Sequence, residues 1–60
     1  MKQIVKIEIN GQDIETLKAT INSYGHIEIM RTIGNFMILA SSEGFTKFEE
    51  ETGISTYAPF

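Results

Sequence analysis

The sequence lacks most of the residues that commonly stabilise or equip a very small protein. It contains no Cys and no Trp among its 60 residues, and only one His and one Pro. Disulfides and cysteine catalysis are therefore excluded, and one imidazole leaves little scope for a metal site, which needs three or four ligands. A chain of this length buries only about 60% of the surface that its unfolded form exposes. Self-association is the remaining means of extra stability.

Long apolar runs and an excess of positive charge are also missing. No apolar run approaches the roughly 18 residues that a membrane span needs, and the N-terminal segment does not resemble a signal peptide. Five basic and eight acidic side chains give a net charge of -3, which disfavours binding to nucleic acids and favours a partner with a basic surface. We expect a cytoplasmic protein (in the host cytoplasm if the source is viral) that binds no membrane and no nucleic acid.

The first half of the chain shows a strand pattern, then a helix pattern. Apolar and polar residues alternate over residues 3–9, which predicts a half-buried strand that ends at Asn10-Gly11. From Ile14 to Tyr24 the apolar residues recur at helical spacing, with Asp13 in the N-cap position.

The second half predicts two strands, a helix and a last strand. Alternation continues on both sides of Gly34-Asn35, a two-residue hairpin signal. Ser41 or Ser42 is expected to cap a second helix that ends at Gly53, and residues 54–57 are expected to form a short edge strand. The order β-α-β-β-α-β predicts one compact domain, residues 1–60, of the α+β class: a ferredoxin-like βαββαβ two-layer sandwich with an antiparallel sheet.

The predicted sheet has apolar side chains on both faces. If the helices cover Val5, Ile7 and Ile9, the opposite face presents four apolar residues among charged ones, and such a patch is typical of an interaction surface. We therefore predict a homodimer interface formed by Ile4, Met30, Met37 and Leu39. The alternative is an apolar central strand that its neighbours partly shield.

Three consecutive acidic residues, Glu49, Glu50 and Glu51, lie in the expected last turn of the second helix, where they oppose the helix dipole. We interpret them, with Tyr57 on the exposed last strand, as the surface that contacts a partner, and the last strand is available for strand addition. The alternative is a solvated helix face that keeps the protein soluble.

Few residues suggest catalysis. His26 is the only imidazole, and as a general base or metal ligand it would have Glu28 on the same strand face. The alternative is a surface histidine near a helix C-terminus, where positive charge is mildly favoured. We expect no catalytic residues, no metal and no cofactor.

The stretch from Gly11 to Ile29 resembles the first half of an ACT-type regulatory domain through Ile14, Leu17, Ile21, Gly25, Ile27 and Ile29. The resemblance implies a small molecule, such as an amino acid, bound around Gly11 and Gln12 at a subunit interface. Gln12 departs from the pattern, because those domains carry a hydrophobic residue there.

The favoured hypothesis is a small acidic, non-enzymatic binding protein that works as a homodimer and inhibits a larger protein by occupying its surface. Phage-encoded antagonists of host enzymes or defence systems are examples of this size class. The ACT-like ligand-binding module is the alternative, and a dimeric enzyme that uses His26 ranks last.

Overall fold

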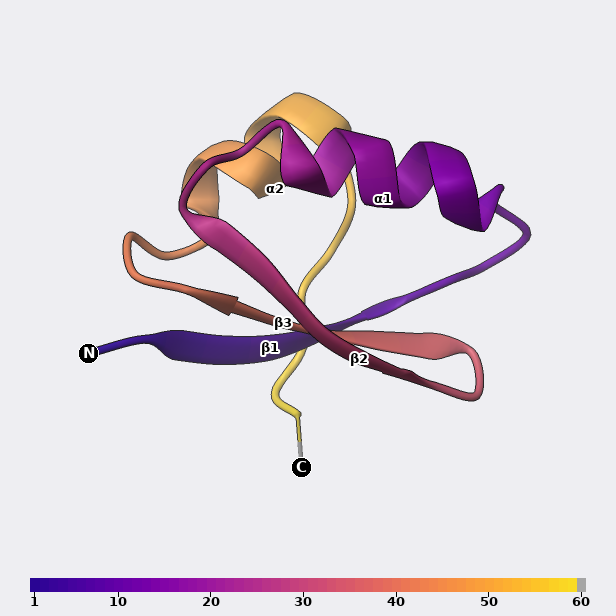
Figure 1. The fold of residues 1–60 in the computed structure, drawn as a ribbon, viewed down its shortest axis with the longest axis horizontal. Coiled ribbons are helices and arrows are strands. Elements are labelled where there is room, and N and C mark those ends of the chain that lie inside the picture. Colours follow the sequence, from indigo (N-terminus) through magenta and orange to yellow (C-terminus); the bar gives the residue numbers. More distant parts are fainter. Residues whose placement is uncertain (60) are drawn as a thin grey trace.

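The computed structural model describes residues 1–59, which form a three-stranded sheet covered on one face by two helices (Figure 1). Strands β1 (Gln3–Glu8), β2 (Ile27–Ile33) and β3 (Phe36–Ser41) lie in the order β1-β3-β2, with the central β3 antiparallel to both neighbours. Helices α1 (Ile14–Asn22) and α2 (Thr46–Thr52) lie on the same side of the sheet. The prediction of an α+β fold with an antiparallel sheet is confirmed. None of the described helices has the length and apolarity to cross a bilayer.

The predicted last strand is reduced to a single bridge. Only Tyr57 pairs with β1, through two backbone hydrogen bonds of 2.9 Å with Lys6. Continuing the ladder through the predicted strand would pair Ser55 with Glu8, but no backbone hydrogen bond joins these two residues, and the Thr56 N–H is donated to the Glu49 carboxylate at 3.1 Å. Beyond Tyr57 the next such pair would join Ile4 to Pro59, which has no N–H to donate. The described sheet therefore has three strands, not four.

A bulge at Met30 interrupts the regular alternation of β2. Ile29 pairs with Leu39, and Arg31 pairs with Ile38, so Met30 is an extra residue between two consecutive partners. A bulge shifts the strand by one residue, and every later side chain then points to the other face of the sheet. Consequently Ile27 and Ile29 face the helices, whereas Arg31 and Ile33 lie on the open face.

The bulge also determines which face of β3 is buried. Ile33 pairs with Phe36 across the hairpin, so Phe36 and Ile38 share the open face with Ile33. Met37 and Leu39 then point toward the helices, where both are fully buried. Their predicted place on an exposed dimer surface is therefore wrong. Ile4 and Met30 do lie exposed on the open side, at 43% and 52%.

The core lies between the sheet and the two helices. Phe45 and Phe48 of the α2 segment are buried, and their rings meet edge to face with centroids 6.5 Å apart. They pack with apolar residues from α1 and all three strands: Val5, Ile7, Leu17, Ile21, Ile27, Met37 and Leu39.

Ser41 does not cap α2, which begins five residues later at Thr46. Its buried hydroxyl instead donates to the Gly44 carbonyl at 2.8 Å and accepts from the Glu43 N–H at 3.1 Å. Ser41 thus organises the β3–α2 loop. The predicted end of α2 at Gly53 is confirmed, with this glycine in the left-handed conformation (φ 73°) that favours it.

Candidate functional site

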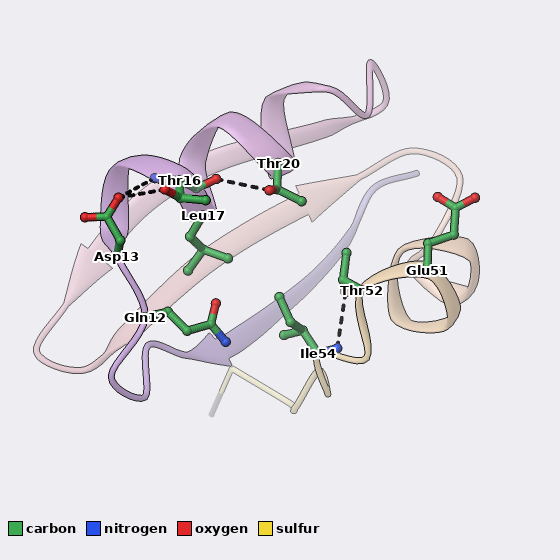
Figure 2. Close-up of a pocket in the computed structure, with 8 residues that line it drawn as sticks. All are labelled: Gln12, Asp13, Thr16, Leu17, Thr20, Glu51, Thr52 and Ile54. Carbon is green, nitrogen blue, oxygen red and sulfur yellow. Dashed lines mark hydrogen bonds between the residues drawn. The ribbon is translucent and has the colours of Figure 1, made fainter.

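A groove separates the two helices on the outer side of the molecule (Figure 2). No Cα atom of α1 lies within 8 Å of a Cα atom of α2, so the two helix backbones stand apart. The main hollow has a volume of about 540 Å³, and a smaller one of about 220 Å³ adjoins it, with Gln12, Thr52 and Ile54 lining both. We call the two together the inter-helix groove. The main hollow is lined by Gln12, Asp13, Thr16, Leu17, Thr20, Glu51, Thr52 and Ile54.

Among residues 1–59, every charged side chain that lines the inter-helix groove is acidic. Asp13 and Glu51 line the main hollow and Glu8 lines the smaller one, whereas no Lys or Arg within residues 1–59 lines either. Carboxylates of one sign in a concave site attract ions of the opposite charge. The groove therefore favours a cationic group.

Asp13 combines a structural role with its place in the groove. Its side chain accepts hydrogen bonds from the Thr16 backbone N–H at 3.0 Å and the Thr16 hydroxyl at 2.7 Å (Figure 2), which confirms it as the N-cap of α1. The hydrogen bonds from the hydroxyl and then the N–H lower the pKa of the Asp13 carboxyl from its ordinary value. Asp13 is therefore a carboxylate at neutral pH.

Glu51 is held at the groove by a residue from the other helix segment. Tyr24, just beyond α1, donates its hydroxyl to the Glu51 carboxylate at 2.6 Å, and its ring packs edge to face on Phe48 with centroids 5.4 Å apart. The hydrogen bond to Glu51, with desolvation and the negative charge of Glu51 as smaller causes, raises the pKa of Tyr24. A carboxylate accepts several hydrogen bonds, so Glu51 keeps capacity for a ligand.

The three predicted contact glutamates do not form one surface. Glu49 accepts from the Thr56 N–H at 3.1 Å and the Thr56 hydroxyl at 2.7 Å, and so ties the C-terminal segment to α2. Glu50 is exposed and makes no side-chain hydrogen bond with the described part of the chain. Of the four predicted contact residues, only Glu51 and Tyr57 line the inter-helix groove.

Sequence reasoning missed the polar side of α1. Asp13, Thr16 and Thr20 are spaced i, i+3 and i+7, so they form a row along one side of the helix. The Thr20 hydroxyl donates to the Thr16 carbonyl at 3.0 Å, and the row lines the groove. The helical spacing of these three polar residues was a signal for the site, but the apolar stripe along the same helix is the more conspicuous pattern.

His26 is half-buried and meets the Tyr24 ring edge to face, with centroids 6.1 Å apart. No group of three or more His, Cys, Asp or Glu residues able to hold a metal occurs within residues 1–59. His26 is not among the residues that line the groove.

Comparison with protein-family models, with curated protein sequences and with solved structures gave no match.

Acid should weaken the Asp13 cap. Because the folded pKa of Asp13 lies below its unfolded value, its contribution to stability is present above the unfolded pKa of about 3.9 and is lost as pH falls through the folded pKa. We expect the melting temperature of Asp13→Asn, which keeps the cap but not the charge, to fall less on acidification to about pH 2. Asp13→Ala should melt lower than both at pH 7. Parallel acid curves for the parent and Asp13→Asn would contradict this assignment.

Proposed function

We propose that this chain is a small non-enzymatic binding protein whose acidic inter-helix groove accepts a basic side chain of a larger protein. Such a protein acts by occupying its partner's surface, as an inhibitor does. The supporting observation is a groove of about 540 Å³ with carboxylates and no cation among its described lining residues.

The shape of the groove suits an arginine or lysine side chain. Leu17 and Ile54 supply an apolar floor, while Asp13 and Glu51 belong to opposite sides, α1 and α2. Arg and Lys bury an apolar stem and keep a charged head at a polar rim. Arg suits either carboxylate better than Lys does, because its planar guanidinium carries five donors and pairs with a carboxylate in a fixed geometry.

The proposal includes the ferredoxin-like plan, with its fourth strand reduced to one residue. The Lys6–Tyr57 bridge lies on the free side of β1, which is where a fourth strand would continue the order β1-β3-β2. This arrangement brings Tyr57 to the smaller hollow beside Glu8.

A second candidate function is the binding of a free amino acid, in the manner of an ACT-like module. Gln12 lines both hollows, so the residue that the resemblance singled out does lie at the groove. A free amino acid also carries a carboxylate, however, and no Lys or Arg of the described groove lining would pair with it. The groove therefore favours a basic side chain within a polypeptide.

The test is a titration of ¹⁵N-labelled protein with penta-arginine amide, followed by amide chemical shifts. We expect saturable, salt-sensitive shifts at Gln12, Thr16, Thr20 and Thr52, and a several-fold weaker affinity for Glu51→Gln. Gln retains an oxygen for the Tyr24 hydroxyl, so the variant should keep its fold. Glu43→Gln is the matched control, because it removes the same charge at an exposed site outside the groove and should bind like the parent.

If Glu51→Gln and Glu43→Gln weakened the affinity for penta-arginine amide equally, the binding would depend on net charge alone. That result would overturn the groove as the site. Shifts with glycine or leucine but none with penta-arginine amide would favour the ACT-like alternative.

A further inference from the structure

The loop between β1 and α1 places an asparagine directly before a glycine, at the edge of the inter-helix groove. Asn10 lines the smaller hollow together with Glu8. Asn10 and Gly11 are both exposed, and a Cβ placed on Gly11 would meet no atom within 4 Å. Gly11 has a φ of 71°, which favours glycine over other residues. The turn itself therefore requires a residue that has no side chain to shield its backbone nitrogen.

The backbone nitrogen of Gly11 is accessible to react with the side chain before it. Within residues 1–59 neither the Gly11 N–H nor the Asn10 side chain makes a hydrogen bond. Once deprotonated, this nitrogen can attack Cγ of Asn10 and close a succinimide ring, while the amide nitrogen of Asn10 takes up a proton and leaves as ammonia. Asparagine is thermolabile in proteins for this reason.

Water completes the reaction by opening the succinimide. Cleavage of the bond between Cγ and nitrogen gives aspartate, and cleavage of the bond between the backbone carbonyl carbon and nitrogen gives isoaspartate. The sum is asparagine plus water giving aspartate plus ammonia, so no oxidant, cofactor or second protein enters.

Regular structure holds Asn22 against the same reaction. Asn22 is the last residue of α1, and the nitrogen that would have to attack belongs to Ser23. The Ser23 N–H donates to the carbonyls of Ala19 and Thr20, both at 3.2 Å. The helical backbone and these hydrogen bonds keep that nitrogen away from the Asn22 side chain.

Asn35, the third asparagine of the chain, is held by the β2–β3 hairpin. Its carbonyl accepts from the Ile9 N–H at 2.6 Å, and the next residue, Phe36, begins β3 opposite Ile33. The attacking nitrogen would belong to Phe36, whose ring crowds it and whose backbone is part of the sheet. Of the three asparagines, Asn10 alone combines an unhindered nitrogen with a loop outside helix and strand.

From these differences we propose that Asn10 is a site of spontaneous deamidation in the folded chain, which adds a carboxylate to the smaller hollow. The product carries one more negative charge than the parent, whose net charge is -3, and carries it where Glu8 already lies. The isoaspartate form also lengthens the backbone by one methylene ahead of the Asp13 cap. The acidity of the groove therefore increases as the protein ages.

The test is mass spectrometry of tryptic peptides after the folded parent has been kept at mildly alkaline pH. Trypsin separates the three asparagines, because residues 7–18, 19–31 and 32–47 each contain one of them. Each deamidation adds about 1 Da. We expect this shift several-fold faster in peptide 7–18 than in the other two, with aspartate and isoaspartate forms of equal mass resolved by chromatography. Equal rates in all three peptides would overturn the proposal.

Two controls separate the contribution of the fold from that of the dipeptide. In guanidinium chloride the loss of the Asn22 amide should accelerate while that of Asn10 changes little, because the fold protects only the first. An Asn10 that reacts only after denaturation would overturn the assignment. Gly11→Ala should slow the reaction at Asn10 several-fold by shielding the nitrogen, and circular dichroism shows whether this variant tolerates the positive φ.

The added carboxylate should also strengthen binding at the groove, an expectation that rests on the proposed function. Asn10→Asp supplies the aspartate product and should bind penta-arginine amide several-fold more tightly than the parent. Asn22→Asp adds the same charge outside both hollows and should bind like the parent. Equal affinities of these two variants would overturn the effect on the groove. A parent without affinity would overturn the proposed function, whereas the peptide masses decide the modification independently.

Discussion

Replacing Met37 by lysine is expected to unfold the chain, whereas the same change at Met30 should leave it folded. Met37 is fully buried between β3 and the helices, while Met30 is 52% exposed at the bulge. An uncompensated buried charge costs about 3–5 kcal/mol, and a 60-residue domain has a total stability of only about 3–9 kcal/mol. Far-UV circular dichroism with thermal melting at low micromolar concentration measures both variants.

The pair of methionine variants tests the bulge directly. A strand β2 without a bulge would place Met30 and Met37 on one face, and the two lysine variants would then behave alike. A cooperative transition for Met37→Lys near the parent's melting temperature would contradict the register described here. Met30→Leu and Met37→Leu serve as controls, because both keep apolar volume and should melt close to the parent.

Truncation of Phe48 to alanine should have an effect of similar size. Phe48 is fully buried and its ring packs edge to face on both Tyr24 and Phe45. Phe→Ala changes in cores cost about 3–5 kcal/mol, which is comparable with the whole stability of so small a domain. We expect little or no folded protein at 25 °C for Phe48→Ala, and Phe48→Leu to retain a cooperative transition at lower urea concentration.

Urea denaturation followed by circular dichroism measures this loss, and Phe36→Ala is the matched control. Phe36 lies on the open face, is only half-buried and has Lys6 4.7 Å above its ring. Phe36→Ala should therefore lower the free energy of unfolding less than Phe48→Ala does. Equal losses at the two positions would mean that the helix side of the sheet is not the main core.

Apolar periodicity, together with cap and turn residues, was enough to predict the elements that local backbone interactions determine. The apolar stripe and the Asp13 cap predicted α1, Gly34-Asn35 predicted the β2–β3 hairpin, and Gly53 predicted the end of α2. Each of these features acts within one turn of the backbone. Ser41 shows where such reasoning ends, because its hydroxyl is satisfied inside the β3–α2 loop and not at a helix terminus.

The candidate site was predictable only in part. Glu51 and Tyr57 were singled out from the sequence and do line the inter-helix groove, but Glu49 lies in a contact with Thr56 that joins residues seven apart. Asp13 was predicted as a cap and not as a groove residue. The groove depends on the distance between two helices, and the residue pattern of one helix does not specify that distance.

By itself the sequence determined the order of helices and strands up to α2, the absence of disulfides and the acidic charge, since these follow from composition and from local backbone preferences. The tertiary structure alone decided which side of β3 is buried and where the last strand ends. The reason is that one extra residue at Met30 reverses every side chain after it, and an alternating pattern reads the same whichever face the helices cover. The pairing of Tyr57 with β1 likewise required the C-terminal segment to return across the sheet.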